Sequence, residues 1–313
     1  MNITDNSLQN KISTFAKELG FQSIGFAHAQ KLESEAHRLE KWLDNGHHGK
    51  MRYMENHFDK RVDPTLLVPG AKTVISLSYN YHHPSKQNDP LAPKIATYAY
   101  GRDYHKVVKK KLKLLFEYLQ SIAGKIEGRY FVDSAPVMER EWAARAGIGW
   151  IGKNTLLLTP GTGSYFFLAE MIVDLEMVPN LPIKDHCGTC TRCIDSCPTE
   201  AISPKGYLLD ASKCISYLTI ELREDIPLQF KGKMEGWIFG CDICQDVCPW
   251  NRFSKKHNEE DFEPHPELLH LTKKDWEALS EESYNQILQK TPVSRIKFSG
   301  LKRNIAFLDS SEK

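Results

Sequence analysis

The sequence predicts an α/β (α+β) domain over residues 1–178, a small cysteine-rich domain over residues 179–252 and a short helical tail over residues 253–313. Two observations carry this prediction. Helix-like and strand-like spacings of apolar residues alternate along the first 178 positions, which is typical of a mixed α/β core. Eight cysteines then follow between Cys187 and Cys248, with none elsewhere in the chain.

The elements of the first domain are predicted from apolar periodicity and from helix breakers. Residues 7–19 carry apolar side chains at helical spacing, and Gly20 is a typical C-terminal cap. Runs rich in β-branched and aromatic residues predict strands, and longer amphipathic runs predict helices. Strands are expected at 23–27, 73–81, 129–133 and 165–174, and further helices at 31–43, 104–122 and 137–146. Residues 179–182 are predicted to be a linker, and the polar residues 254–266 to be exposed.

Composition and charge exclude several classes of protein. The 313 residues hold 41 Lys and Arg against 40 Asp and Glu, so a uniformly basic coat is excluded but a local basic patch is not. No apolar run approaches the ~18 residues of a membrane span, and the first residues lack the basic and apolar regions of a secretory signal. We therefore expect a soluble, cytoplasmic protein that does not associate with membranes.

The spacing of the cysteines predicts iron–sulfur clusters. Cys187, Cys190, Cys193 and Cys197 form the run C-x2-C-x2-C-x3-C, followed by Pro198, which is the pattern of bacterial ferredoxins with two clusters. In such a run the first three thiolates bind one cluster and the fourth binds the other. A second run ends the region in the same way. It comprises Cys241, Cys244 and Cys248-Pro249, with Cys214 placed before an insertion.

Crossed ligation assigns all eight thiolates to two [4Fe–4S] clusters. The first cluster takes Cys187, Cys190, Cys193 and Cys248. The second takes Cys197, Cys214, Cys241 and Cys244. The alternative is a pair of zinc sites, because C-x2-C pairs also suit zinc. Zinc requires neither the triple spacing nor the C-P ending, so the clusters are preferred, and they imply redox chemistry.

Asp133 is the sharpest candidate outside the cysteine region. It ends a predicted strand and precedes a predicted helix, so it is either a helix cap or a proton donor at the end of a strand. A proton donor must be protonated near neutral pH, which requires surroundings that raise its pKa. Phe131 and Trp150 are expected to supply such apolar surroundings.

Three glycines match a nucleotide-binding pattern without its context. Gly147, Gly149 and Gly152 fit G-x-G-x-x-G, but they follow a predicted helix, whereas the dinucleotide fingerprint follows a strand and opens a helix. We therefore expect a tight turn beside a bound group rather than a dinucleotide site.

These features together resemble the epoxyqueuosine reductase family, and the resemblance covers nearly the whole chain. The eight-cysteine layout agrees with that family. So do the blocks Lys60-Arg61-Val62-Asp63-Pro64, Gly101-Arg102-Asp103-Tyr104-His105, residues 132–140, residues 146–154 and residues 163–170. Some members carry a C-terminal helical-repeat extension. The sequence ends at Lys313, so the resemblance places it with the short members.

The resemblance implies a fold, a reaction and a set of site residues. The first domain is expected to bind cobalamin and substrate, with a ferredoxin-like domain packed against it. The expected reaction reduces epoxyqueuosine to queuosine at the wobble position of tRNA, with Asp133 as proton donor. Tyr104 and His105 are expected to line the substrate pocket. The residues expected around the corrin are Arg61, Asp133, Asn154, Leu157, Leu168 and Ser216.

Partners follow from the same resemblance. We expect an external electron donor, a monomeric state and electrostatic binding of tRNA. Two basic runs are candidates for the RNA contact, and either could instead be a solvated helix face. They are Lys106, Lys109, Lys110 and Lys111, and Arg295, Lys297, Lys302 and Arg303.

Three rival functions share some of these features. A corrinoid reductive dehalogenase also combines cobalamin with two clusters, but such proteins usually carry an export signal. A simple two-cluster electron carrier does not need the 186 residues that precede the first cysteine. An RNA-binding protein with structural clusters is the third alternative.

Overall fold

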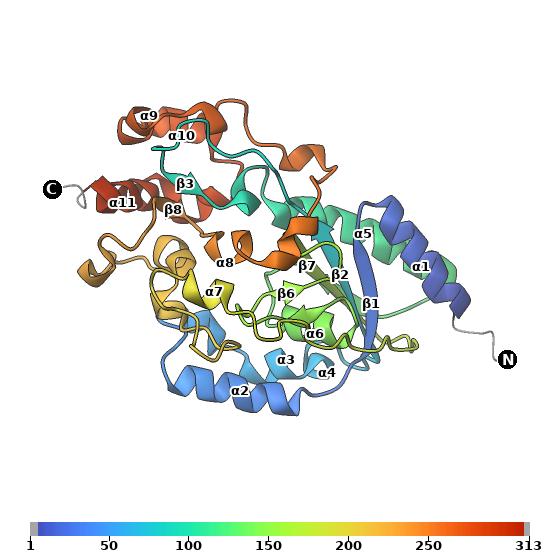
Figure 1. The fold of residues 1–313 in the computed structure, drawn as a ribbon. Helices are drawn as coiled ribbons and strands as arrows, with labels where there is room; N and C mark the ends of the chain where they lie inside the picture. Colours follow the sequence, from blue (N-terminus) through green and yellow to red (C-terminus); the bar gives the residue numbers. More distant parts are fainter. Residues whose placement is uncertain (1–5, 310–313) are drawn as a thin grey trace.

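The computed structural model describes residues 6–309, and an antiparallel sheet lies at the centre of the first half of the chain (Figure 1). The sheet has the strand order β1-β2-β7-β4, and every neighbouring pair is antiparallel. Its strands are β1 (Ser23–His28), β2 (Thr73–Asn80), β4 (Gly128–Phe131) and β7 (Phe166–Val173). The predicted mixed α/β fold is confirmed, with an antiparallel rather than a parallel central sheet.

Helices cover both faces of this sheet. Successive side chains of each strand point to opposite faces, and apolar side chains lie on both faces. Ile75, Leu77 and Met171 pack with α1 (Asn6–Glu18) and α5 (Tyr104–Ala123) in one core cluster. Val74 and Ile172 lie on the opposite face and pack with Trp142 of α6 (Glu139–Arg145). Figure 1 shows α1 and α5 beside β1 and α6 across the sheet from them.

The other elements are short and surround this layered core. The remaining helices are α2 (Glu33–Asp44), α3 (Phe58–Val62), α4 (Pro64–Leu67), α7 (Arg192–Asp195), α8 (Ile243–Asp246), α9 (Lys273–Glu277), α10 (Glu281–Ile287) and α11 (Lys297–Asp309). The remaining strands are β3 (Lys94–Ile95), β5 (Trp150–Ile151), β6 (Leu157–Leu158) and β8 (Trp237–Phe239). Single helical turns lie at Arg52–Met54, Thr97–Ala99, Ala211–Lys213, Tyr217–Glu221, Leu228–Phe230, Pro249–Phe253, Glu260–Phe262, Leu268–His270 and Pro292–Ile296.

The expectation that residues 254–266 are exposed is wrong at two positions. His257 and Phe262 are buried, and the ring of Phe262 packs against Tyr79 and Phe167 in the core of the sheet. The Tyr79 hydroxyl also donates a hydrogen bond of 2.6 Å to Glu259. The segment is polar in sequence because only two of its side chains enter the core, while the others remain at the surface.

The division of the chain at residues 178 and 252 stays a prediction, because contacts cross both boundaries. β3, from the first part, pairs in parallel with β8, from the cysteine-rich part. Ile95 also belongs to the same apolar cluster as Trp276 and Leu301 of the tail. Within residues 6–309, no helix is both long enough and apolar enough to cross a membrane.

Candidate active site and cluster-binding region

The fold gathers the eight cysteines into two groups. Cys187, Cys190, Cys193 and Cys248 line one cavity. Burial raises the pKa of Cys193 to about 11, and the neighbouring thiols of Cys248 and Cys187 raise it further. This is the first group that crossed ligation requires, with Cys248 joining the run that begins at Cys187.

The second group lies deeper in the protein. Burial raises the pKa of Cys241, and the thiols of Cys214 and Cys197 add to the shift. Burial also raises the pKa of Cys244, and the thiols of Cys214, Cys241, Cys193 and Cys197 add to the shift. Burying an unpaired thiolate costs free energy, whereas a thiolate bound to a metal cation is compensated. The burial of these cysteines therefore suits ligands of iron.

The geometry of the sulfurs favours clusters over single zinc ions. Four thiolates around one zinc, with Zn–S bonds of about 2.3 Å, would lie about 3.8 Å from one another. Among the residues that the structure describes, no three of the cysteine sulfurs lie within 4.8 Å of one another. The sulfurs are therefore not arranged as they would be around a single zinc ion.

The turn before the first cysteine group carries the glycines that match the nucleotide pattern. A Cβ at Gly152 would lie 2.6 Å from Leu158 and 3.4 Å from the Sγ of Cys187. The Nζ of Lys153 donates to the carbonyl oxygens of Gly188 and Cys190, at 2.7 and 3.0 Å. The turn therefore lies against the cysteine loop, as expected of a turn beside a bound group.

Asp133 lies between two elements and contacts side chains from both. Its Oδ2 accepts a hydrogen bond from the Tyr104 hydroxyl and lies 3.5 Å from the Nε2 of His105, both at the start of α5. Its backbone N–H donates to the Oε1 of Glu139, at the start of α6, at 2.7 Å. The Asp133 side chain is 58% exposed, so a bound molecule could reach its carboxylate.

The expectation that Phe131 and Trp150 provide apolar surroundings for Asp133 is wrong. Phe131 belongs to the cluster around Trp142, on the face of the sheet toward α6. Trp150 lies beside the first cysteine group, with its ring 4.9 Å from that of Trp250. Polar neighbours therefore determine the charge of Asp133.

The carboxylate form of Asp133 is favoured in the structure. Burial opposes ionisation, but the hydrogen bonds from His105 and Tyr104 and the charge of His105 outweigh it and lower the pKa of Asp133. For His105, burial is likewise outweighed by Asp103 and Asp133, and its pKa rises to about 9. Near neutral pH the proton therefore lies on His105, next to an ionised Asp133.

Two acids beside Asp133, the half-buried Glu139 and the buried Glu170, were missed by sequence reasoning. Burial and the charge of Asp133 raise the pKa of Glu139 to about 8. Burial and then Glu139 raise the pKa of Glu170, which is 0% exposed, well above its usual value. The signal that could have revealed Glu170 is a single acid within the apolar strand 166–173.

Of the residues expected around a corrin, Asn154 and Ser216 lie beside the second cysteine group. Leu157 and Leu168 belong to one apolar cluster. Asn154 donates from Nδ2 to the carbonyl oxygen of Cys244, at 3.4 Å. Ser216 hydrogen-bonds the thiol of Cys214 and lowers its pKa, which burial raises.

Arg61 provides a test of fit for a large polar cofactor. Its Nη2 donates to the carbonyl oxygen of Tyr53 at 2.8 Å, while its buried Nε has no hydrogen-bond partner within the described part of the chain. Burial raises the pKa of Tyr53 to about 12, with Glu221 and Asp133 contributing and Arg295 opposing. The free Nε of Arg61 suits an amide or phosphate oxygen of a bound molecule.

The two basic runs have different environments. Lys106, Lys109 and Lys110 line an open groove of about 640 Å³ that also includes His105 and Ser134, next to Asp133. In the tail, Arg303 donates to the carbonyl oxygens of Leu222, Glu224 and Leu218. Lys302 donates to Glu277 O, and Arg295 pairs with Glu221 at 2.9 Å. The run on α5 is available to a ligand, whereas these tail residues hold elements together.

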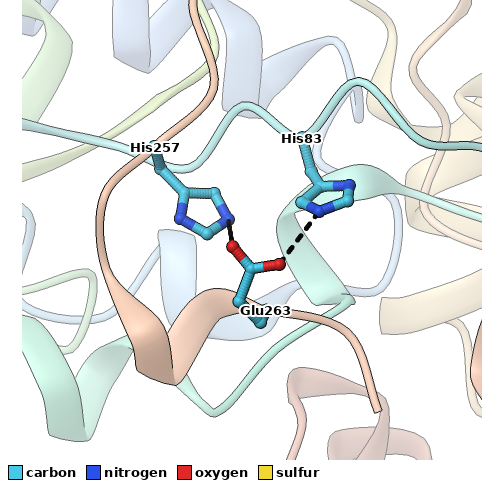
Figure 2. Close-up of side chains that lie close together, drawn as sticks. All are labelled: His83, His257 and Glu263. Carbon is cyan, nitrogen blue, oxygen red and sulfur yellow. Dashed lines mark hydrogen bonds and ion pairs between the residues drawn. The ribbon is translucent and has the colours of Figure 1, made fainter. Parts of the chain in front are cut away.

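A second cluster of possible metal ligands lies away from Asp133 (Figure 2). His83, His257 and Glu263 bring three ligand atoms within 4.8 Å of one another. The Nδ1 of His83 accepts a hydrogen bond from the Ser85 N–H, so its Nε2 carries the proton and donates to Glu263. Lys256 pairs with Glu263 at 2.7 Å. A metal ligand needs the opposite tautomer of His83, so this cluster is better explained as a hydrogen-bonded charge cluster.

Two family models match the chain. The model described as "4Fe-4S double cluster binding domain" matches residues 186–251, which include every cysteine. The model described as "Epoxyqueuosine reductase QueG, DUF1730" matches residues 61–134, from Arg61 to the residue after Asp133.

Relatives and solved structures agree with these models. An epoxyqueuosine reductase of Cellulophaga algicola is 58% identical over 95% of this chain and 96% of its own length. A crystal structure of an epoxyqueuosine reductase with an epoxyqueuosine-modified tRNA stem loop is 32% identical, with a TM-score of 0.90 over 98% of this chain and 82% of its own. In a structure of the Bacillus subtilis enzyme, 32% identical with a TM-score of 0.87 over 98% of this chain and 82% of its own, the catalytic aspartate loop is swung out of the active site.

The rival families are less similar. A catabolic reductive dehalogenase is 14% identical with a TM-score of 0.51 over 96% of this chain and 35% of its own, which shows a shared fold and no more. The chain is 58% identical to an epoxyqueuosine reductase over nearly its full length but only 14% identical to the dehalogenase, and this difference separates the two families. The chain belongs to the epoxyqueuosine reductase family.

Proposed function

We propose that this chain reduces epoxyqueuosine to queuosine at the wobble position of tRNA, using cobalamin and two [4Fe–4S] clusters. The observation that supports the proposal is the group of Asp133, Tyr104 and His105, in which an exposed carboxylate lies next to a hydroxyl and an imidazole that can supply a proton. The membership of the chain in the epoxyqueuosine reductase family supports the same reaction.

The reaction needs two electrons and two protons, because the epoxide oxygen leaves as water. Bound cobalamin supplies a low-valent cobalt, which is a strong reductant for such a C–O bond. Arg61, Asn154, Leu157, Leu168 and Ser216 would hold it. The two clusters would relay single electrons from an external donor, and the thiolates would be assigned by the crossed scheme.

The chain itself supplies the first of the two protons, and the second would come from solvent when His105 and Asp133 are protonated again. Asp103 accepts from the Nδ1 of His105 at 2.7 Å and orients the ring, so that the Nε2 faces Asp133. Once substrate and cofactor exclude water from the site, the charged form of Asp133 becomes less favourable. The proton of His105 Nε2 then moves to Asp133 Oδ2, and Asp133 protonates the oxygen that leaves carbon.

The groove along α5 would bind the tRNA. Its lysines lie next to Asp133, and phosphate neutralisation by lysine is the main source of affinity for RNA. The relative solved with a modified stem loop supports an anticodon-arm substrate for this chain. We further propose that the enzyme acts as a monomer in the cytoplasm.

The test is turnover of epoxyqueuosine-containing tRNA by the reconstituted enzyme. The variant Asp133→Asn keeps the shape of the side chain but cannot donate a comparable proton, so we expect turnover to fall by roughly 10²-fold or more. Its corrin spectrum, iron content and tRNA affinity should match those of the parent. Asp44→Asn, which alters an exposed carboxylate of α2, is the control. Normal turnover by Asp133→Asn would exclude Asp133 as the acid.

A further inference from the structure

The loop that carries Asp133 is held in a costly backbone conformation. Residues 132–138, here called the Asp133 loop, connect the end of β4 to the start of α6. Asp133 itself has a φ of +50°, in the left-handed region that residues with a Cβ seldom adopt. Such a residue keeps its conformation only where neighbouring groups compensate for the strain.

Glu139 provides one such compensating contact. Its Oε1 accepts the backbone N–H of Asp133 at 2.7 Å, which closes the loop between its catalytic residue and the helix that follows. The hydroxyl of Tyr104 and the ring of His105 hold the Asp133 carboxylate from the other side. The backbone and the side chain of Asp133 are thus fixed by different elements.

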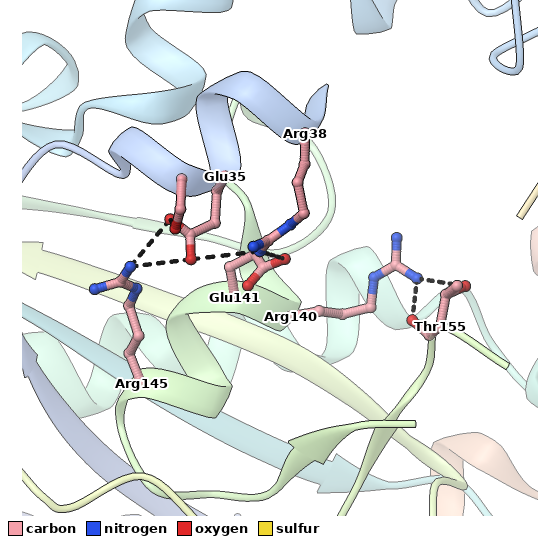
Figure 3. Close-up of polar contacts among 7 residues, drawn as sticks. Glu35, Arg38, Arg140, Glu141, Arg145 and Thr155 are labelled. Carbon is pink, nitrogen blue, oxygen red and sulfur yellow. Dashed lines mark hydrogen bonds and ion pairs between the residues drawn. The ribbon is translucent and has the colours of Figure 1, made fainter. Parts of the chain in front are cut away.

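Helix α6 is a firm support for this contact because its other side chains are anchored (Figure 3). Arg145 pairs with the buried Glu35 of α2 through both carboxylate oxygens, at 3.0 Å each. Arg38 of α2 pairs with Glu141 at 3.0 Å, and Arg140 donates to the carbonyl oxygen of Thr155. The first residue of α6 therefore has a defined position relative to the sheet.

We propose that Glu139 is a positioning residue that holds the Asp133 loop in the active site through the Asp133 N–H. The proposal rests on the role of Asp133 given above, and it adds a residue that acts on substrate only through Asp133. The relative whose catalytic loop is swung out shows that a loop of this kind has a second position in that protein. Loss of the Glu139 contact is expected to favour such a position here.

The protonation state of Glu139 suggests a substitution that keeps its hydrogen bond to the Asp133 N–H and one that removes it. Burial raises the pKa of Glu139 to about 8, so the carboxyl is mostly neutral at pH 7. A neutral carboxyl accepts the Asp133 N–H through its carbonyl oxygen, and the amide of glutamine has the same shape and the same acceptor. Glu139→Gln should therefore behave as the parent, while Glu139→Ala should not.

The experiment compares hydrogen exchange and kinetics for four full-length enzymes reconstituted with cofactors. They are the parent, Glu139→Ala, Glu139→Gln and Glu40→Ala, where Glu40 is a 65% exposed residue of α2. Mass-spectrometric exchange of the peptide covering residues 132–138 should accelerate on the order of tenfold in Glu139→Ala alone, the scale of one lost hydrogen bond. Its kcat should fall about tenfold or more with an unchanged KM for tRNA, because a displaced acid affects chemistry rather than binding.

Each outcome decides the proposal. Parent-like exchange and kcat in Glu139→Ala would overturn it, and so would a defect in Glu139→Gln as large as that in Glu139→Ala. If Glu139→Ala does not fold, Glu139→Gln still tests the proposal, since it must retain parent-like kcat and loop protection. The exchange measurement does not depend on activity. A failure of the Asp133 assignment, seen as normal turnover in Asp133→Asn, is therefore distinguishable from a failure of the Glu139 assignment.

Discussion

Asp133 takes its charge state from side chains that reach it from two helices. Tyr104 and His105 donate toward its carboxylate, and Glu139 accepts from its backbone. The sequence suggested a protonated carboxyl in an apolar pocket, whereas the contacts in the structure lower the pKa of Asp133 and raise that of His105 to about 9, which favours an ion pair. The proposed acid is therefore a pair of residues, and the raised pKa of His105 favours the proton on its ring.

This pair predicts a pH dependence at the residue scale. The pKa of His105 in the fold is raised to about 9 from 6.5, so the charge that stabilises the pair is fully present below pH 6.5 and is lost as the pH rises through about 9. We expect kcat to decline on the alkaline side near pH 9. His105→Gln should remove this decline and lower kcat by roughly 10²-fold at pH 7, as measured by turnover from pH 6.5 to 10. An unchanged alkaline decline in His105→Gln would assign it to another group.

The crossed ligation makes a second prediction for single residues. Cys248→Ala should disturb the cluster held by Cys187, although its chain neighbours are Cys241 and Cys244. Iron in protein purified without oxygen should fall from about eight to about four atoms per chain. The residual electron paramagnetic resonance spectrum should match that of Cys187→Ala and differ from that of Cys244→Ala. A match to Cys244→Ala instead would exclude the crossed scheme.

At the scale of elements, α5 combines a core face with a ligand face. Leu112, Leu115 and Leu119 are fully buried against the sheet, while Lys109 and Lys110 line the open groove on the other side. The tail helix α11 uses its basic residues differently, because Arg303 bonds backbone carbonyl oxygens. Basic runs that are similar in sequence thus have different functions.

The groove of α5 predicts the main electrostatic contact with tRNA. The double variant Lys109→Glu/Lys110→Glu should weaken binding about tenfold or more at low salt and should reduce the slope of log Kd against log salt, because fewer phosphates are neutralised. Lys17→Glu, an exposed charge reversal on α1, is the matched control. Binding is measured by filter retention or fluorescence anisotropy over a salt series. Equal affinities for the double variant and the control would remove α5 from the RNA footprint.

At the scale of the whole molecule, two acids with raised pKa values, the half-buried Glu139 and the buried Glu170, lie next to the proposed catalytic loop. Glu170 projects from the middle of β7 and Glu139 begins α6, so they belong to elements that pack on each other. Both acids have a pKa above the usual 4.5, which means that the folded state retains protons that the unfolded chain releases. Stability should therefore decrease as the pH rises above about 4.5 toward 8.

Glu170→Gln tests this coupling between fold and protonation. Glutamine has the shape of the neutral acid but does not titrate, so the variant should lose less stability than the parent between pH 5 and pH 8. The measurement is the midpoint of thermal unfolding at several pH values, with Glu40→Gln as the control for an exposed acid. A parent-like pH slope in Glu170→Gln would show that Glu170 is already ionised in the folded protein.

The sequence by itself determined the features that depend on local pattern. Cysteine spacing predicts the double-cluster domain because ligand order along the chain reflects cluster geometry, and the matched model at residues 186–251 agrees. Apolar periodicity predicts most elements, because one face of each helix or strand must be buried. Asp133 was singled out because it ends one element and precedes another.

Tertiary structure alone decided what depends on residues that are distant in sequence. The pKa directions of Asp133 and His105 follow from contacts across the start of α5, and Glu139 and Glu170 meet only when α6 packs on β7. The role of Arg303 depends on carbonyl oxygens about 80 residues away in the chain. No local pattern encodes these distances, because protonation and hydrogen bonding respond to the groups within a few ångströms in space, whatever their separation along the chain.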